Sequence, residues 1–347
     1  MDNPSLLPSD IGEIDEKKME EAALEAYVAA LGDEYTEYLT ERELQALMEN
    51  ANGAYVGVGV YIASNDVKNE ILVISVLEDS PAHKSGIKPG DVIKKIDGVE
   101  YKGSQLTEAS NIMRGKEGTT VKITIERNEE LIDLDVVRAN IKLKCVSSKK
   151  LEDRMGYIKI SSFDGGCAKD FKEQYEKLKN DGIDSLVIDL RNNGGGLLDE
   201  SLEIAEMIVP KNSTMIITRD AKNNEEASTS KTEPTINVPV VILVNGYTAS
   251  ASEVLTAAVK ENTNTKVVGT KTFGKGIIQG VFLFSDKKTG MKITMQEYYT
   301  PNHTKIHKVG ITPDYVIQLD DGTDGKLSLN GDKIDNQLAK AMELLKK

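Results

Sequence analysis

Apolar and polar positions follow three different patterns along the chain, and each pattern predicts its own kind of structure. Between residues 15 and 49, apolar residues recur every three or four positions, which is the period of an amphipathic helix. The first run stops at Gly32. The second begins at Thr40 and carries Glu43 three residues later, a capping-box pattern. We therefore expect two helices in this segment, and it contains no catalytic grouping of residues.

From Tyr55 to about Ile141 the pattern changes to short strands. Gly, Pro and Asn separate the strand-like runs, and one helix interrupts them near residues 105–113. The runs are VGVGVYI, EILVISVL, DVIKKIDG, TTVKITIER and LIDLDVVRA. This pattern predicts a small, self-contained β-rich module.

One run of this module offers a binding feature. In GVGV, Gly57 and Gly59 free successive backbone N–H groups to hold a carboxylate, and the strand beyond them can pair with an extended peptide. A module that only packs against its neighbour is the alternative, because Gly-x-Gly alone is a weak signal.

From Gly156 onward, buried apolar strands alternate with amphipathic helices. The strand-like runs are GYIKISSF, SLVIDL, VPVVILVNG and KVVGT. In the helix AKDFKEQYEKLKNDG, one stripe consists of Ala168, Phe171, Tyr175 and Leu178. The alternation predicts an α/β layer with an at least partly parallel sheet.

The rest of this region is simpler to interpret. The polar segment 219–237 predicts a surface loop. The runs GVFLFS and GMKITMQEYY predict a hairpin-like pair of strands, and DNQLAKAMELLKK predicts a terminal helix.

Composition narrows the class of protein. A length of 347 residues favours two or three modules. The formal net charge of −13 argues against a nucleic-acid binder, which needs a basic face to neutralise phosphates. No apolar run approaches 18 residues, and MDNPSLLPSD has no leader pattern, so we expect either a cytosolic protein or a chain whose leader was removed. For Cys145 and Cys167, two separate buried thiols are favoured over a disulfide.

Three hydroxyls stand close together in the segment NGYTASASEVL, at Thr248, Ser250 and Ser252. They occupy a predicted strand-to-helix turn, which exposes a side chain and directs the N–H groups of the helix N-terminus to the same place. This position suits an acyl-transfer nucleophile, because the N–H groups of the helix N-terminus can donate hydrogen bonds to an oxyanion. However, Ser250 also precedes Glu253 by three residues, so a purely structural N-cap explains it equally well.

A lysine is the candidate partner for such a hydroxyl. Lys275 lies in TFGKGIIQ, between two glycines and among apolar residues. The glycines allow another segment to approach closely, and apolar neighbours lower the pKa of the amine and make it available as a general base. The alternative is an ordinary solvated surface lysine.

A Gly-rich segment, DLRNNGGGLLD, follows a buried strand and opens a helix. It lacks the Gly-Lys-Ser/Thr of a P-loop and the GxGxxG of a dinucleotide site. An oxyanion hole is the remaining functional interpretation, and a tight turn is the structural one.

The three histidines do not suggest a catalytic triad or a metal site. His83 lies in the β-rich module, and His303 and His307 lie in TPNHTKIHK without an HExxH helix around them. We expect His303 and His307 to be solvated loop residues.

Together these segments resemble the carboxyl-terminal processing peptidases, serine proteases with a Ser–Lys dyad and an inserted PDZ domain. The β-rich module resembles a PDZ domain in GVGV, SPAHKSGIKPGDVIKKIDG and GTTVKITIER. The other matching segments are ALGDEYTEYLTERE, GYIKISSF, IDLRNNGGGLLD, VNGYTASASEVLTAAV, VVGTKTFGKGIIQ and YYTPNHTKIHKVGITPD.

The resemblance implies a multidomain α/β fold, a crotonase/Clp-protease-like α/β protease core with an inserted β-rich PDZ domain and an N-terminal helical arm. The expected divisions are residues 1–53 for the arm, 54–141 for the PDZ domain, 142–320 for the protease core and 321–347 for a C-terminal helical segment.

The resemblance also implies roles for individual residues. Ser250 takes the place of the nucleophile, Lys275 that of the base and Gln279 that of a residue that orients the base. The implied oxyanion donors are the N–H groups of Ala251 and of the glycine loop, at Gly195 or its neighbour Gly194, where members often carry proline. The implied peptide-binding residues are Gly57, Val58, Gly59 and Val60.

The partners implied by the resemblance are proteins or peptides with free C-termini, with no metal, organic cofactor or nucleic acid. It further implies a homodimer through the N-terminal and C-terminal helices, and a location outside the cytoplasmic membrane. Two other functions remain open: a catalytically silent PDZ scaffold and an acyl-CoA enzyme of similar layout. The joint presence of Ser250, Lys275 and Gln279 disfavours the first, and the PDZ-like module has no purpose in the second.

Overall fold

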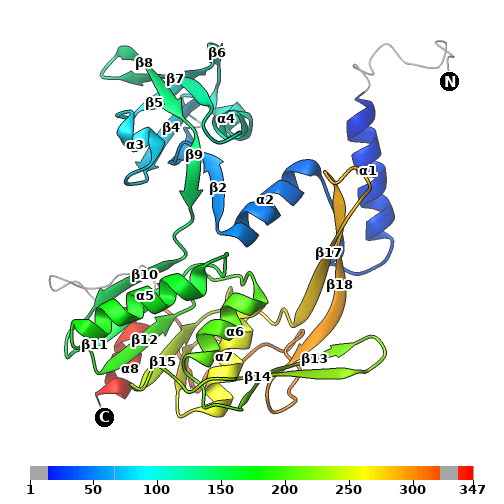
Figure 1. Ribbon diagram of the computed structural model, residues 1–347, viewed down its shortest axis with the longest axis vertical. Coiled ribbons are helices and arrows are strands. Elements are labelled where there is room, and N and C mark those ends of the chain that lie inside the picture. The colour runs from blue at the N-terminus through cyan, green and yellow to red at the C-terminus, as the bar shows by residue number, and fades with distance from the viewer. Residues whose placement is uncertain (1–14, 66, 321–334, 347) are drawn as a thin grey trace. The chain divides into compact units, whose positions relative to one another are not determined.

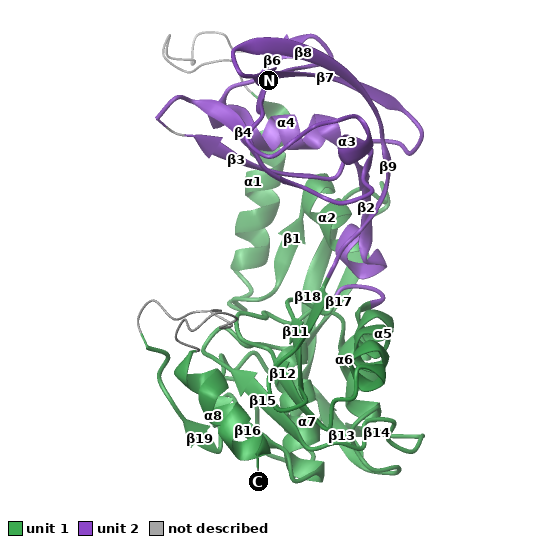
Figure 2. Ribbon diagram, turned by 90° about the vertical axis from the view of Figure 1, so that its left-hand side faces the viewer, with its two compact units in different colours: residues 1–48, 145–163, 167–347 green, residues 49–144, 164–166 purple. Residues whose placement is uncertain are grey.

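The computed structural model describes residues 15–65, 67–320 and 335–346. The chain divides into two compact units (Figure 2). Unit 1 comprises residues 1–48, 145–163 and 167–347, and unit 2 comprises residues 49–144 and 164–166. The N-terminal segment MDNPSLLPSD and residues 321–334 of the expected C-terminal segment lie outside the described part of the chain.

A six-stranded sheet forms the centre of unit 1. Its strands, in spatial order, are β10 (Val146–Lys150), β11 (Met155–Ile160), β12 (Ser185–Asp189), β15 (Val240–Val244), β16 (Lys266–Gly269) and β19 (Tyr315–Val316). Only the pair β10–β11 is antiparallel, and the other pairs are parallel. The prediction of a partly parallel sheet is therefore confirmed.

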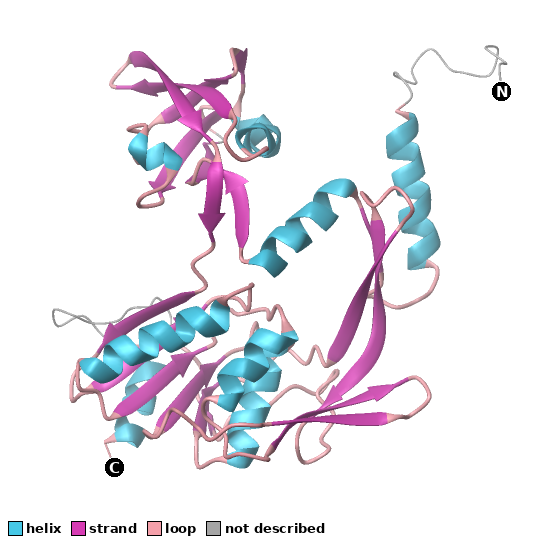
Figure 3. Ribbon diagram, in the orientation of Figure 1, coloured by secondary structure: helices cyan, strands magenta, loops and turns pink. Residues whose placement is uncertain are grey.

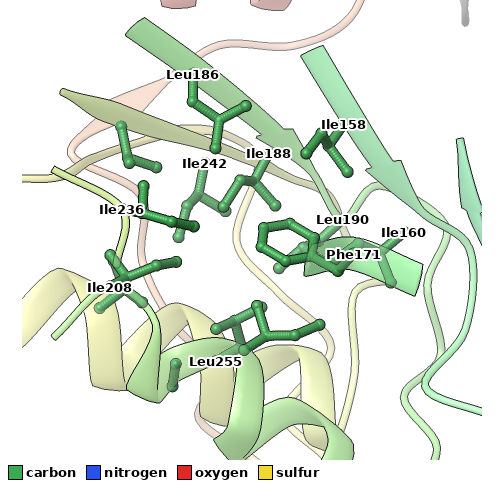
Figure 4. Close-up of a cluster of buried hydrophobic side chains, with 14 of the residues drawn as sticks. Ile158, Ile160, Phe171, Leu186, Ile188, Leu190, Ile208, Ile236, Ile242 and Leu255 are labelled. Atoms are coloured by element: carbon green, nitrogen blue, oxygen red, sulfur yellow. The ribbon is translucent and has the colours of Figure 1, made fainter. Parts of the chain in front are cut away.

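Helices cover both faces of this sheet, because successive strand residues point to opposite sides. Leu186 and Ile188 join the larger core, together with Phe171 and Leu255 (Figure 4). The helices on that face are α5 (Cys167–Asn180), α6 (Leu198–Glu206) and α7 (Ala251–Asn262). Val187 faces the other way and packs with residues of α8 (Asn336–Leu345). The predicted apolar stripe of α5 is buried throughout.

A second, antiparallel sheet completes unit 1 (Figure 3). Its strands are β1 (Glu37–Leu39), β18 (Gly290–Tyr299), β13 (Thr214–Asp220), β14 (Glu225–Thr229) and β17 (Ile277–Leu283). The predicted pair β17–β18 is confirmed. The prediction of a loop over residues 219–237 is wrong for β14, whose polar sequence suits an exposed edge strand paired with β13 only.

The N-terminal segment contains the two predicted helices, α1 (Glu16–Ala29) and α2 (Glu41–Asn52) (Figure 1). The Glu43 N–H donates to Thr40 Oγ1 at 3.3 Å and the Thr40 N–H donates to Glu43 Oε2 at 3.0 Å, so the capping box is confirmed. Between these helices lies β1, which the helical pattern did not predict. Its three residues pair with β18. A strand this short is not stable alone, and the backbone hydrogen bonds to β18 stabilise it.

Unit 2 contains the predicted β-rich module. Its main sheet consists of β3 (Val60–Asn65), β4 (Glu70–Val76), β5 (Val92–Ile96), β7 (Thr120–Arg127) and β8 (Glu130–Val137), with β6 (Val99–Glu100) paired to β5. A two-stranded ribbon joins β2 (Ala54–Gly57) to β9 (Ala139–Lys142). The predicted helix is α4 (Leu106–Met113), and a short α3 (Pro81–Lys84) adds to it. Strand β3 lies at the edge of the main sheet.

A buried ion cluster joins the end of β12 to α8. Arg191 donates to Asp189 Oδ2 at 2.6 Å, to Asp335 at 3.0 Å and to Gln337 at 3.0 Å. Tyr157 donates its hydroxyl to Asp189 at 2.7 Å. Charge-assisted pairs of this kind are costly to break when buried, so this cluster fixes the strand end from which the Gly-rich segment starts.

Cys145 and Cys167 are both buried and form no disulfide, which confirms two separate thiols. In the described part of the chain, no helix has both the length and the apolar character that crossing a membrane requires.

Candidate active site

Ser250 occupies a sharp turn between β15 and α7. Its backbone angles are φ 55° and ψ −120°, in a region that residues with a side chain rarely adopt. Such strain costs on the order of 1–3 kcal/mol and persists only where the surrounding structure imposes it. A strained strand-to-helix turn is the geometry that presents a nucleophilic serine at the end of an α/β sheet.

The two other hydroxyls of this turn are committed to backbone groups. Thr248 donates to the Leu190 carbonyl at 2.9 Å, and Ser252 donates to the Asn193 carbonyl at 3.1 Å. Both residues are fully buried. Ser250 is partly exposed, and its hydroxyl donates to no group in the described part of the chain. Of the three candidates, the fold leaves Ser250 available for chemistry.

One buried carboxylate connects the backbones of Ser250 and Lys275. Glu253 Oε2 accepts the N–H of Ser250 at 3.0 Å and the N–H of Lys275 at 2.8 Å. Its other oxygen accepts the Thr272 hydroxyl at 2.5 Å and the Gly274 N–H at 2.8 Å. Burial raises the pKa of Glu253, and these hydrogen bonds act against that rise.

The sequence pattern accounted for only half of this role. The Ser250–Glu253 bond is the one that the capping-box pattern predicted, whereas the bonds to residues 272–275 were missed. The signal that was overlooked is a charged residue inside the otherwise apolar helix ASEVLTAAV, because such a charge must find partners when it is buried.

Lys275 lies on a loop that another segment approaches closely. A Cβ atom added to Gly276 would stand 2.3 Å from the His307 backbone nitrogen, so only glycine fits there. The Lys275 side chain is half-buried. Burial, and next the charge of Lys292, lower the pKa of the amine, as the sequence led us to expect.

The Lys275 amine lies against an aromatic ring. Its Nζ is 5.2 Å from the centroid of the Tyr35 ring, and no hydrogen bond joins it to Ser250 Oγ among the residues that the structure describes. Gln279 donates its side-chain N–H to the Tyr35 carbonyl at 2.5 Å. The fold thus connects the backbones of Ser250 and Lys275, while the side chains of Lys275 and Gln279 meet at Tyr35. Nothing in the local sequence pointed to Tyr35.

The candidate oxyanion donors stand beside Ser250. The Ala251 N–H is the first of helix α7 and has no acceptor among the described residues. Gly195, at φ 104°, lies so close that an added Cβ would come within 2.8 Å of Ser250 Cβ. Its N–H, however, donates to Asn193 Oδ1 at 2.9 Å, whereas the exposed Gly194 has no such bond within the described ranges.

The expectation of a solvated loop residue is wrong for His307. Its ring packs edge-on against Tyr35, with ring centroids 5.8 Å apart, and its Nδ1 is buried without a hydrogen-bond partner. His303 is exposed, and His83 accepts the Asp79 N–H at 3.3 Å. No cluster of metal-ligating side chains occurs in residues 15–65, 67–320 and 335–346.

The predicted peptide-binding loop lies before the edge strand β3. The Val58 carbonyl accepts the Ala82 N–H at 2.8 Å, and the Gly59 carbonyl accepts the Leu77 N–H at 3.0 Å. The N–H groups of Val58 and Gly59 have no acceptor in the described residues. Two adjacent unpaired donors next to a free strand edge can hold the end of an extended peptide.

Comparison with known proteins defines the class. Residues 154–317 match peptidase family S41, and residues 54–137 match the PDZ domain. The chain therefore contains a peptidase family S41 domain and a PDZ domain. The expected fold, an α/β protease core with an inserted PDZ domain, is confirmed.

Particular relatives point the same way. Over 302 residues the chain is 39% identical to a protein of Staphylococcus haemolyticus (strain JCSC1435) named "Probable CtpA-like serine protease", covering 86% of this chain and 60% of that protein. It is 37% identical over 305 residues to a protein of the same name from Staphylococcus aureus (strain COL), covering 87% and 61%. The chain thus spans about 60% of the length of these relatives. A solved structure of a photosystem II D1 C-terminal processing protease shares 28% identity, with a TM-score of 0.52 over 88% of this chain and 83% of that chain.

Proposed function

We propose that the chain is a serine endopeptidase that cleaves proteins near their C-termini with Ser250 and Lys275 as a dyad. The observation that carries this proposal is the strained turn at Ser250, tied through Glu253 to the backbone of Lys275. A strained, accessible serine beside unpaired N–H donors serves acyl transfer, and the Staphylococcus haemolyticus relative is named "Probable CtpA-like serine protease".

In the proposed mechanism, neutral Lys275 takes the proton of the Ser250 hydroxyl while Oγ attacks the peptide carbonyl. The N–H of Ala251 and one N–H of the glycine loop, from Gly194 or Gly195, donate to the oxyanion. The Lys275 ammonium then protonates the leaving amine, and the same amine activates the water that hydrolyses the acyl-enzyme. The Lys275 amine lies over the Tyr35 ring, and the mechanism requires it to come within hydrogen-bond distance of Ser250 Oγ.

An acylating β-lactone probe tests the nucleophile. We expect one acyl group on the tryptic peptide 232–260, at Ser250, in the wild type. Ser250→Ala should lose the adduct, and Ser147→Ala, at an exposed serine of β10, should keep it. Fragment sequencing distinguishes Ser250 from Ser252. An adduct that survives in Ser250→Ala would refute the assignment, and no adduct in any variant would favour the silent PDZ scaffold.

We further propose that the PDZ domain binds the C-terminus of the substrate along the edge of β3 and thereby controls cleavage. The unpaired N–H groups of Val58 and Gly59 support a site for the terminal carboxylate, with Gly57 and Val60 flanking it.

Amidation of a peptide ligand tests this site without altering the protein. We expect a peptide with an apolar, free C-terminus to bind at least about tenfold more tightly than its C-terminal amide, because the amide carries no charge for the two N–H donors. Fluorescence anisotropy measures both affinities on Ser250→Ala, so that the peptide is not consumed. Equal affinities of the acid and the amide would refute the proposed site for the terminal carboxylate.

We retain a homodimer and an extracytoplasmic location as proposals. The exposed apolar residues of α1, Met19 and Tyr27 among them, support a dimer through the N-terminal helix. Helix α8 buries its apolar face on its own sheet, which leaves it less suited to that purpose. Sedimentation equilibrium tests the dimer, and a monomer at micromolar concentration would contradict it.

A further inference from the structure

Tyr35 contacts both residues that the proposed function assigns to the base. Its ring centroid lies 5.2 Å from Lys275 Nζ, and its carbonyl accepts the Gln279 side-chain N–H at 2.5 Å. His307 packs against the same ring, with an interplanar angle of 68°. No other residue in the described part of the chain has an interaction with the Lys275 amine and a hydrogen bond to Gln279 at once.

The backbone that carries Tyr35 is fixed by its own turn and by β18. Asp33 accepts the Tyr35 N–H at 3.3 Å and the Thr36 hydroxyl at 2.5 Å. Thr36 Oγ1 in turn accepts the N–H of Thr294, a residue of β18, at 3.2 Å. Directly after this turn, β1 pairs with β18. The backbone position of Tyr35, from which the ring extends, is therefore set by hydrogen bonds on both sides.

Resting on the proposed function, we propose that Tyr35 is a positioning residue of the dyad base: its ring holds the Lys275 ammonium away from Ser250 until the amine loses its proton. An aromatic face attracts a cation within about 6 Å and attracts a neutral amine far less. The protonated side chain therefore stays on the ring, and the neutral one is free to turn toward Ser250.

The groups around Lys275 differ in which protonation state of its amine they favour. Burial and the positive charge of Lys292 favour the neutral amine, whereas the carboxylate of Glu37 favours the ammonium. Lys292 and Glu37 also form an ion pair with each other. The Glu253 carboxylate accepts the backbone N–H of Lys275. His307 packs against the Tyr35 ring. The Tyr35 ring favours the ammonium form of Lys275. The protonation state of Lys275 and the position of its side chain therefore change together. The proton goes to solvent, and the freed amine then accepts the proton of Ser250.

Two substitutions separate the aromatic face from the bulk of the side chain. Tyr35→Phe keeps the face and loses the hydroxyl, and Tyr35→Leu keeps an apolar side chain without the face. The pKa of Lys275 can be read directly by NMR titration of protein labelled with ¹³C-lysine, with the resonance assigned by its loss in Lys275→Arg. This readout needs no turnover.

We expect Tyr35→Leu to lower the pKa of Lys275 by about half a unit relative to Tyr35→Phe, which corresponds to the attraction that an aromatic face exerts on an exposed or half-buried cation. The acid limb of the kcat/KM profile should move to lower pH by the same amount. Tyr35→Met serves as a second variant without an aromatic face, with folding of each checked by circular dichroism.

The outcomes keep the two proposals apart. Equal Lys275 titrations in the Phe, Leu and Met variants would overturn the positioning role of Tyr35, whether or not the chain cleaves peptides. A shifted titration in a protein that shows no peptidase activity would leave the contact standing and refute the proposed function.

Discussion

Lys275→Ala is expected to lower kcat for β-casein by about 10³-fold, because the variant lacks the amine that takes the proton of Ser250 in the proposed mechanism. Thr248 and Ser252 are bound to backbone carbonyls, and Glu253 already accepts four hydrogen bonds. The control is Lys271→Ala, at an exposed lysine of the same loop, for which we expect kcat within about twofold of wild type.

The pH dependence of the wild type sharpens this prediction. Burial lowers the pKa of the Lys275 amine from its usual 10.5, and a base acts only when neutral. Peptidase activity should therefore rise with pH and reach half its plateau below pH 10.5. If Lys275→Ala kept more than about a tenth of kcat and the same pH profile, the base would be another group.

Glu253→Ala is expected to lower both stability and activity. The substitution leaves the N–H groups of Ser250, Gly274 and Lys275 and the Thr272 hydroxyl without their acceptor. Buried donors that lose a charged partner cost about 3–5 kcal/mol in free energy of unfolding. We expect kcat to fall by about 10²-fold in the protein that remains folded, because the turn and the loop lose their common attachment.

Urea unfolding followed by circular dichroism measures this effect, since the chain has no Trp. Glu203→Ala, at an exposed carboxylate of α6, is the matched control, and its unfolding free energy should stay within about 0.5 kcal/mol of wild type. Glu253→Gln keeps the volume but points an N–H at groups that also donate, so we expect an intermediate loss. A Glu253→Ala variant with wild-type stability and kcat would contradict the role of this carboxylate in holding the Ser250 turn and the Lys275 loop in place.

Local patterns predicted the parts of the fold that local patterns determine. The stripe on α5 and the apolar run of β12 are set by burial against their neighbours, and the capping box at Thr40 is set within four residues. Strands β1 and β14 were missed because each depends on a partner strand elsewhere in the chain. A polar or short segment lacks the hydrophobic pattern from which strand pairing could be predicted.

The site divides in the same way. Ser250 and Lys275 could be named as candidates from their immediate neighbours, since a strand-to-helix turn and flanking glycines are local features, and the family resemblance selected them. The position of the Lys275 side chain could not, because Tyr35 stands more than two hundred residues earlier in the chain. The second half of the Glu253 role was hidden for the same reason, as it joins helix α7 to a loop beyond β16.

A crystal structure with a peptide boronate bound at the active site tests the dyad most directly. We predict Lys275 Nζ within about 2.6–3.2 Å of Ser250 Oγ, with the amine off the Tyr35 ring. An amine that remains on Tyr35 with the boronate bonded to Ser250, and another group in contact with Oγ, would contradict the account.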